Sequence, residues 1–204
     1  MVIDINEINI DGPCKILHIG AHEAEELDLY ISNGWKDVVW VEAIPEKYEI
    51  VKHKISSYEN MKVFNYAVWI ESGLTFDFYQ TNNGQSSSIY PLKKHSQVYP
   101  DIIVDKIISV NTITVDDLMK NIGWQPDLIY LDIQGAEYEA LLGAKNTLNK
   151  TKYIYTEVSY DELYDGAKLE PELTAMLEKF NFHKKLEVKA IDSWGDAFYV
   201  KNKD

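Results

Sequence analysis

The stretch PDLIYLDIQGAEYEALLGA, residues 126–144, predicts a buried strand that turns directly into a helix. Residues 127–133 are mostly apolar, which is typical of a strand covered on both faces. Gly135 permits the turn, and the alanines that follow repeat every four residues, as on one face of a helix. Asp132 and Glu137 stand on either side of that turn. In α/β sheets ligands bind outside the carboxyl ends of the strands, so these acids mark a candidate site.

Strands and helices alternate along the rest of the chain. The predicted strands occupy residues 14–20, 37–43, 62–69, 74–81, 105–113, 127–133, 152–159, 183–190 and 196–202. The predicted helices occupy residues 24–34, 45–58, 115–120, 136–144 and 170–180. Thr114 is a suitable N-cap for the third of these helices, and Trp194 and Gly195 are expected to form the turn between the last two strands. This order predicts one domain over residues 1–204, with a mostly parallel, doubly wound α/β sheet and an antiparallel hairpin at its edge.

Composition and charge narrow the class of protein. The 204 residues are 46% hydrophobic, which allows a sizeable core, and the net charge of −13 argues against a nucleic-acid partner. The single cysteine, Cys14, excludes an internal disulfide and indicates either a reducing compartment or indifference to redox state. The first residues lack the basic start and apolar run of a signal peptide, and no apolar stretch is long enough to span a membrane. We therefore expect a cytoplasmic protein; its oligomeric state is not indicated.

Two of the other strand ends favour a nucleoside ligand. Gly20 follows the first predicted strand, and Glu42 ends the second, 22 positions later. An acid at about this distance suits a ribose, because a carboxylate accepts hydrogen bonds from both hydroxyls. The G-x-G-x-x-G fingerprint of dinucleotide sites is absent, and Glu23, Glu25 and Glu26 would repel a pyrophosphate. A nucleoside with a positive centre fits better, and S-adenosylmethionine, a sulfonium, is such a nucleoside.

The chain resembles the FkbM-type S-adenosylmethionine-dependent methyltransferases along nearly its whole length. The stretches that carry the resemblance are ILHIGAHEAEE, VVWVEAIPEKY, NYAV, NNGQSSS, ITVDDL, YLDIQGAEYEALLGA, YTEVS and GDAFYV. The resemblance implies a Rossmann-like class I methyltransferase fold and O-methylation of a sugar hydroxyl, as in a deoxyhexose such as rhamnose or fucose of a glycan or glycoconjugate. The chain departs from the family at His18 and Ala24, where members often carry an acid and a glycine.

Nine residues are expected to bind the donor. They are Gly20, Ala21, His22, Glu42, Ala43, Ala67, Val68, Ser87 and Asp132. Several have a simpler interpretation: Gly20 as a turn glycine, Glu42 as a solvated strand end, and Ala67 with Val68 as core packing. His18 lies within an apolar strand and is expected to be a hydrogen-bonded core residue.

Four residues are the catalytic candidates, namely Asp132, Glu157, Glu137 and His22. Asp132 and Glu157 end neighbouring predicted strands, and a buried carboxylate is costly unless it is paired or used. The two acids suit a general base for a sugar hydroxyl, or ligands for Mg²⁺ that would lower the pKa of that hydroxyl. Glu137 also fits a simple acid in the first turn of a helix, and nothing in the spacing of the acids demands a metal.

The insertion at residues 82–101 interrupts the strand–helix rhythm and is expected to form the acceptor side and a lid. The acceptor candidates are Gln85, Ser86, Ser88 and Tyr90. An exposed hairpin tip is the simpler interpretation of this run of hydroxyls and amides. Two other functions compete with a methyltransferase of a small-molecule or glycan acceptor. One is a non-catalytic nucleoside- or sugar-binding module; the other, a nicotinamide-dependent oxidoreductase, is disfavoured by the missing glycines.

Overall fold

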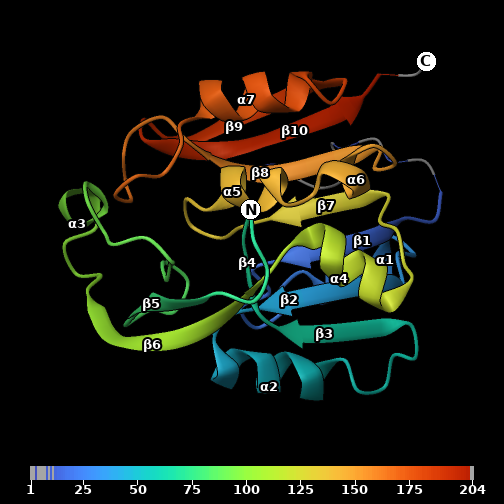
Figure 1. Cartoon of the computed structure of the whole chain (residues 1–204), viewed down its shortest axis with the longest axis horizontal. Coiled ribbons are helices and arrows are strands. Elements are labelled where there is room, and N and C mark those ends of the chain that lie inside the picture. The colour runs from blue at the N-terminus through green and yellow to red at the C-terminus, as the bar shows by residue number, and fades with distance from the viewer. Residues whose placement is uncertain (1–2, 4–7, 9, 11, 203–204) are drawn as a thin grey trace.

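The computed structural model describes residues 3, 8, 10 and 12–202, and its centre is a seven-stranded sheet (Figure 1). In spatial order the strands are β3 (Met61–Asn65), β2 (Asp37–Glu42), β1 (Lys15–Ile19), β7 (Leu128–Leu131), β8 (Tyr153–Ser159), β10 (Trp194–Lys201) and β9 (Phe182–Ile191). The first five are parallel, and β10 runs antiparallel to both of its neighbours. The predicted mostly parallel sheet with an antiparallel edge hairpin is confirmed.

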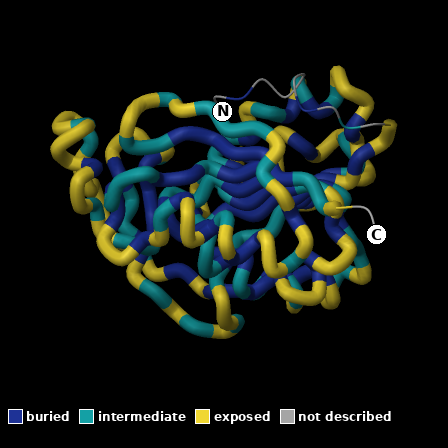
Figure 2. Tube along the Cα trace, turned by 90° about the horizontal axis from the view of Figure 1, so that it is seen from above, coloured by how far each residue is buried: buried dark blue, intermediate teal, exposed yellow. Residues whose placement is uncertain are grey.

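Helices cover both faces of this sheet. The helices are α1 (Leu27–Ser32), α2 (Pro45–Lys54), α3 (His95–Val98), α4 (Val115–Ile122), α5 (Glu137–Leu142), α6 (Lys145–Leu148) and α7 (Glu170–Glu178). Helices α4 to α7 pack in the core of one face with Leu17 and Ile129, whereas α1 and α2 pack in the core of the other face with Ile16 and Leu128. Successive strand residues point to opposite faces, so each strand supplies both cores. Figure 2 shows the buried strands stacked at the centre of the molecule.

A second, smaller sheet projects beside the first (Figure 1). It consists of β4 (Ala67–Val68), β6 (Val104–Ile113) and β5 (Thr75–Thr81), in that order. The prediction of one strand over residues 62–69 is wrong, because β3 ends at Asn65 and β4 joins the second sheet. The Asn65 side-chain amide donates to the carbonyls of Glu42 at 2.8 Å and Ala43 at 3.0 Å, which ties the end of β3 to the end of β2.

The helix predicted over residues 24–34 is shorter in the structure. His22 and Ala24 adopt positive φ angles of 43° and 52°, which a helix does not allow, so α1 begins only at Leu27. The Thr114 cap is confirmed, because its hydroxyl accepts a hydrogen bond from Asp117 N at 3.0 Å. Short helices of this kind depend on tertiary packing for most of their stability.

Two other boundaries differ from the prediction. The helix predicted at 136–144 is shorter in the structure, because α5 ends at Leu142 and a separate helix, α6, begins at Lys145. At Gly143, just after α5, an added Cβ would lie 2.5 Å from the carbonyl oxygen of Trp69. The turn between β9 and β10 lies at residues 192–193, so Trp194 and Gly195 belong to β10 instead. No helix in the described part of the chain is long and apolar enough to cross a membrane.

Candidate functional site

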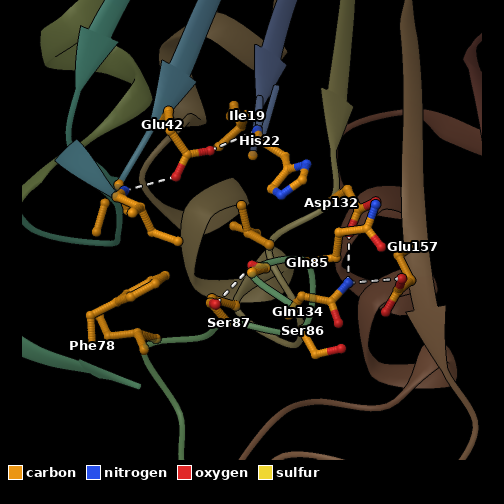
Figure 3. Close-up of a pocket in the computed structure, with 18 of the residues that line it drawn as sticks. Ile19, His22, Glu42, Phe78, Gln85, Ser86, Ser87, Asp132, Gln134 and Glu157 are labelled. Carbon is orange, nitrogen blue, oxygen red and sulfur yellow. Dashed lines mark hydrogen bonds between the residues drawn. The ribbon is translucent and has the colours of Figure 1, made fainter. Parts of the chain in front are cut away.

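A cavity of about 480 Å³ opens at the carboxyl ends of the central strands (Figure 3). Strand β1 has β2 on one side and β7 on the other, so the chain crosses over in opposite directions from this point. Open α/β sheets bind their ligands at such a switch point. Most of the lining comes from the strand ends, the loop at residues 83–89 and the segment at 95–102, and Phe78 and Leu163 add to it.

Gly20 allows β1 and β7 to approach each other closely at the cavity floor. It has a φ of +90°, and an added Cβ would lie 1.9 Å from the carbonyl oxygen of Asp132. Asp132 N donates to Ile19 O at 3.0 Å, and Gly20 N donates to Val41 O at 2.9 Å. Gly20 therefore serves as a turn glycine and lines the cavity as well.

Glu42 is a buried acid at the cavity, with only 6% of its surface exposed. Its Oε2 accepts from His22 N at 2.7 Å, and its Oε1 accepts from Ile44 N at 2.7 Å. Burial raises the pKa of Glu42, while these backbone donors favour its ionised form. It is not a solvated strand end. Each oxygen keeps a further lone pair with which to accept a ligand hydroxyl.

The two histidines of this region have different environments. His22 Nδ1 lies 2.6 Å from Glu25 Oε1, and its buried Nε2 has no hydrogen-bond partner among the described residues. His18 is a hydrogen-bonded core residue as predicted, with Nδ1 2.9 Å from Tyr30 OH. Burial lowers the pKa of His18 to about 3, so its ring is neutral at the cavity floor.

Small apolar residues form the wall on the side of β2 and β4. Ala43, Ala67 and Val68 line the cavity together with Phe78, and Val68 also packs in the core. This wall suits the flat face of an aromatic base. Ala21, in contrast, is buried outside the lining, and its N–H donates to Val41 O at 3.1 Å.

Asp132 directly follows β7, Glu157 lies in β8 one position beyond the last residue paired with β7, and one amide group joins the two acids (Figure 3). Gln134 Nε2 donates to Asp132 Oδ1 at 2.7 Å and to Glu157 Oε2 at 3.1 Å. Burial raises the pKa of both acids, and the charge of Asp132 raises that of Glu157 further. The raised pKa values mean that this pair of carboxyl groups has a high affinity for a proton. A group that accepts a proton from a substrate needs this property.

Gln134 was not singled out from the sequence. It adopts a φ of +55°, and Tyr164 OH donates to its Oε1 at 2.6 Å, which fixes the direction of the amide. The backbone carbonyl oxygen of Gln134 accepts a hydrogen bond from Ser88 Oγ at 2.8 Å. A glutamine beside a strand-end aspartate was the only sequence signal, because its strained backbone and distant partners are set by the fold.

Asp196 is a third acid on the lining that the sequence did not indicate. It faces Glu157 across the β8–β10 pair and accepts hydrogen bonds from Tyr155 OH and from Ile3 N, the latter at 3.2 Å. The register of the hairpin, which is not evident from the sequence, brings it here.

Glu137 lies behind the loop rather than on the lining. Its two oxygens accept from Ile133 N at 2.9 Å and from Gly135 N at 3.0 Å, and burial raises its pKa to about 7. These bonds hold residues 133–135 in the shape that presents Asp132 and Gln134. The geometry thus favours support of the loop over contact with a substrate.

The serine run is not an exposed hairpin tip, because Ser86, Ser87 and Ser88 are buried. Ser87 Oγ accepts from Thr81 N at 3.0 Å and donates to Gly84 O at 2.7 Å, which closes the loop on itself. Gln85 is exposed and lines the cavity with Ser86 and Ser87. Ser88 and Tyr90 lie outside the lining; the Tyr90 ring packs on Trp69 at 5.7 Å.

The FkbM methyltransferase domain matches residues 18–184 of this chain. The chain belongs to that family. The 2-O-methyltransferase NoeI of Sinorhizobium fredii (strain NBRC 101917 / NGR234) is 32% identical over 160 residues, which are 74% of this chain and 65% of that protein. The match therefore spans somewhat less than two thirds of the relative.

Solved structures show that this member of the FkbM family has the class I methyltransferase fold. The magnesium protoporphyrin IX methyltransferase of Synechocystis PCC 6803 with bound S-adenosylmethionine has a TM-score of 0.54 and 9% identity, over 97% of this chain and 74% of that one. TrmK of M. capricolum in complex with S-adenosylhomocysteine has a TM-score of 0.55 and 13% identity, over 95% and 65% of the two chains. At such identities the likeness concerns the fold alone.

The described residues of this family member offer no cluster of three His, Cys, Asp or Glu side chains that could hold a metal ion. Asp132 and Glu157, the two acids considered as possible Mg²⁺ ligands, share the Gln134 amide group. An N–H donor occupies the place between two acids where a cation would bind.

Proposed function

We propose that the protein is an S-adenosylmethionine-dependent O-methyltransferase of a sugar hydroxyl, as in a deoxyhexose such as rhamnose or fucose of a glycan or glycoconjugate. The observation that carries the proposal is the pair of part-buried acids, Asp132 and Glu157, which share one amide group and line the same cavity as Glu42. Methyl-transfer assays with deoxyhexose glycosides test it, and release of S-adenosylhomocysteine is the expected result.

The donor fits the β1–β2 side of the cavity. Glu42 is oriented to accept hydrogen bonds from ribose hydroxyls, and Ala43, Ala67 and Val68 form an apolar wall for the base. Ser87 closes the far side, and acids on the cavity wall favour a sulfonium over an anion. When bound, S-adenosylmethionine supplies a methyl group on a positively charged sulfur.

Asp132 would accept the proton of the acceptor hydroxyl while the protein holds the two reactants in line. Gln134 orients Asp132 through its 2.7 Å hydrogen bond, and Glu157 shares that amide. A sugar hydroxyl is a poor nucleophile until its proton is leaving, so the base is the chief chemical contribution of the chain. We assign the metal-free version of this role, with His22 and Glu137 as supporting groups.

The alternative function is a non-catalytic nucleoside- or sugar-binding module. A module that only binds has no use for two part-buried acids beside the donor pocket, because removing a carboxylate from water is costly. The net charge of −13 favours a glycan over nucleic acid as acceptor, although the fold is shared with Streptococcus pneumoniae Sp1610, a putative tRNA methyltransferase. RNA belongs in the acceptor assays as a comparison.

Replacing Glu42 tests the donor assignment. Glu42→Ala is expected to weaken S-adenosylhomocysteine binding by about 1–3 kcal/mol, because charged hydrogen bonds to the ribose are lost. Calorimetric titration measures the change in affinity. Glu46→Gln is the control, because Glu46 is an exposed acid on α2. Wild-type affinity in Glu42→Ala would remove this residue from the ribose, and failure of the wild type to bind would contradict the methyltransferase proposal.

Gln85 tests the acceptor side of the insertion. It is exposed on the lining, so Gln85→Ala is expected to raise the KM for the acceptor severalfold with the fold unchanged, through loss of about one hydrogen bond. Ser88→Ala serves for comparison, because Ser88 Oγ holds the Gln134 carbonyl and should affect kcat instead. Steady-state kinetics separates an effect on the KM for the acceptor from an effect on kcat. Equal KM values in wild type and Gln85→Ala would exclude Gln85 from the acceptor contact.

A further inference from the structure

The cavity continues beyond the acids to a wall of aromatic residues. We call His95, Tyr99 and Trp194 the outer wall; all three line the cavity. In the β8–β10 pair, Asp196 lies opposite Glu157 and Trp194 opposite Ser159. Alternate strand residues share a face, so Trp194 is on the face of Asp196 and about 7 Å further out along the strand. That distance separates neighbouring rings of a glycan better than parts of one ring.

Hydrogen bonds and ring contacts hold the outer wall in place. Trp194 Nε1 donates to Tyr99 OH at 2.9 Å, and the His95 ring lies 5.1 Å from that of Tyr99 and 5.4 Å from that of Tyr164. Tyr164 in turn donates to Gln134, which binds both catalytic acids. The wall is therefore preorganised relative to the proposed base, which lowers the cost of binding a ligand there.

His95 contributes a nearly enclosed, neutral ring to this wall. The residue is 3% exposed, and its Nδ1 has no partner among the described residues. Burial lowers the pKa of His95, so the imidazole is neutral and adds no charge to the wall. The Nδ1 atom is closed to solvent, so the contribution of His95 to the wall is its ring rather than a hydrogen bond to a ligand.

The charges near the outer wall favour an uncharged ligand. Lys93 pairs with Glu162 at 2.7 Å and Asp165 at 3.0 Å, and Lys94 pairs with Asp161 at 2.5 Å. The cations of this segment are thus engaged by carboxylates. A phosphate would have to displace these carboxylates, whereas a sugar ring would stack on the aromatic side chains.

We propose that the outer wall is a second acceptor subsite, which binds a neutral sugar ring attached glycosidically to the sugar that is methylated. The inference rests on the proposed function. It adds the residues that bind the second sugar ring and the order of glycosyl transfer and methylation. The acceptor arrives after glycosyl transfer, since a disaccharide fills both subsites. A nucleoside-diphosphate sugar would bring its phosphates against the carboxylates instead.

The experiment compares a deoxyhexose-terminated disaccharide with the methyl glycoside of the same deoxyhexose. Wild-type kcat/KM is expected to be about fivefold or more higher for the disaccharide. Trp194→Leu should remove this preference and leave S-adenosylhomocysteine affinity unchanged, whereas Trp194→Phe should retain part of it. Trp124→Leu is the matched control, because Trp124 is also part-buried but lies outside the lining.

A preference that survives in Trp194→Leu, or is absent from the wild type, overturns the subsite. Titration of the disaccharide into protein saturated with S-adenosylhomocysteine separates this proposal from the proposed function. Disaccharide binding that is lost in Trp194→Leu, without methyl transfer in the wild type, would support the subsite and contradict the proposed methyltransferase function. Turnover of both acceptors at equal efficiency would support catalysis and contradict the subsite. A nucleoside-diphosphate deoxyhexose used as efficiently as the disaccharide would overturn the order of reactions.

Discussion

Asp132→Asn is expected to lower the methyl-transfer rate by about 10²-fold or more, the usual scale for loss of a general base. The amide is nearly isosteric and still accepts the hydrogen bond from Gln134 Nε2, so S-adenosylhomocysteine affinity should change little. What the amide cannot do is take the proton of the acceptor hydroxyl. Single-turnover rates and calorimetric titration of the same preparation separate catalysis from binding.

Asp127→Asn is the matched control for this change. Asp127 immediately precedes β7 and therefore lies at its opposite end, where it accepts from Lys15 N at 3.1 Å and pairs with Lys152 at 2.8 Å. Its replacement should leave the rate of transfer near the wild-type value. Full activity in Asp132→Asn would return this acid to a structural role.

A chelator distinguishes the two possible roles of the acid pair, a metal-free general base and a set of Mg²⁺ ligands. EDTA should leave the wild-type rate unchanged, because the Gln134 amide group joins Asp132 and Glu157. Loss of activity that Mg²⁺ restores would contradict this expectation and favour a metal-held hydroxyl. In that event Glu157→Gln should weaken the response to Mg²⁺.

Gly20→Ala is expected to destabilise the protein by about 3 kcal/mol or more. A methyl group at this position meets the Asp132 carbonyl oxygen at 1.9 Å, and the φ of +90° is itself unfavourable for alanine. The backbone of Asp132 would have to move, so activity should fall along with stability. Urea unfolding measures the first effect and methyl transfer the second.

Gly123→Ala provides the control for backbone strain alone. Gly123 also has a positive φ, +61°, but no atom lies within 4 Å of an added Cβ. Its replacement should lower the free energy of unfolding by only about 1–2 kcal/mol, because a residue with a side chain is disfavoured in a left-handed conformation. Equal losses in the two variants would show that close packing at Gly20 adds nothing.

The candidate site could be predicted only where position along a strand was sufficient. Gly20, Glu42 and Asp132 follow apolar strands, and the carboxyl ends of parallel strands meet at one edge, so their neighbourhood was evident from the order of elements. Gln134, Asp196 and Trp194 depend on a left-handed backbone and on the register of the β8–β10 pair. Register and strained dihedrals arise from long-range contacts, which local patterns do not encode.

The amino-acid sequence by itself determined the class of fold, because period-two and period-3.6 patterns alternate in it and specify strands and crossover helices locally. It also placed acids at the ends of strands. The tertiary structure alone decided that residues 62–69 divide between two sheets, that the serine run is buried, and that Gln134 joins Asp132 to Glu157. Each of these depends on which distant segment supplies the hydrogen-bond partners, and that choice is made only when the whole chain packs.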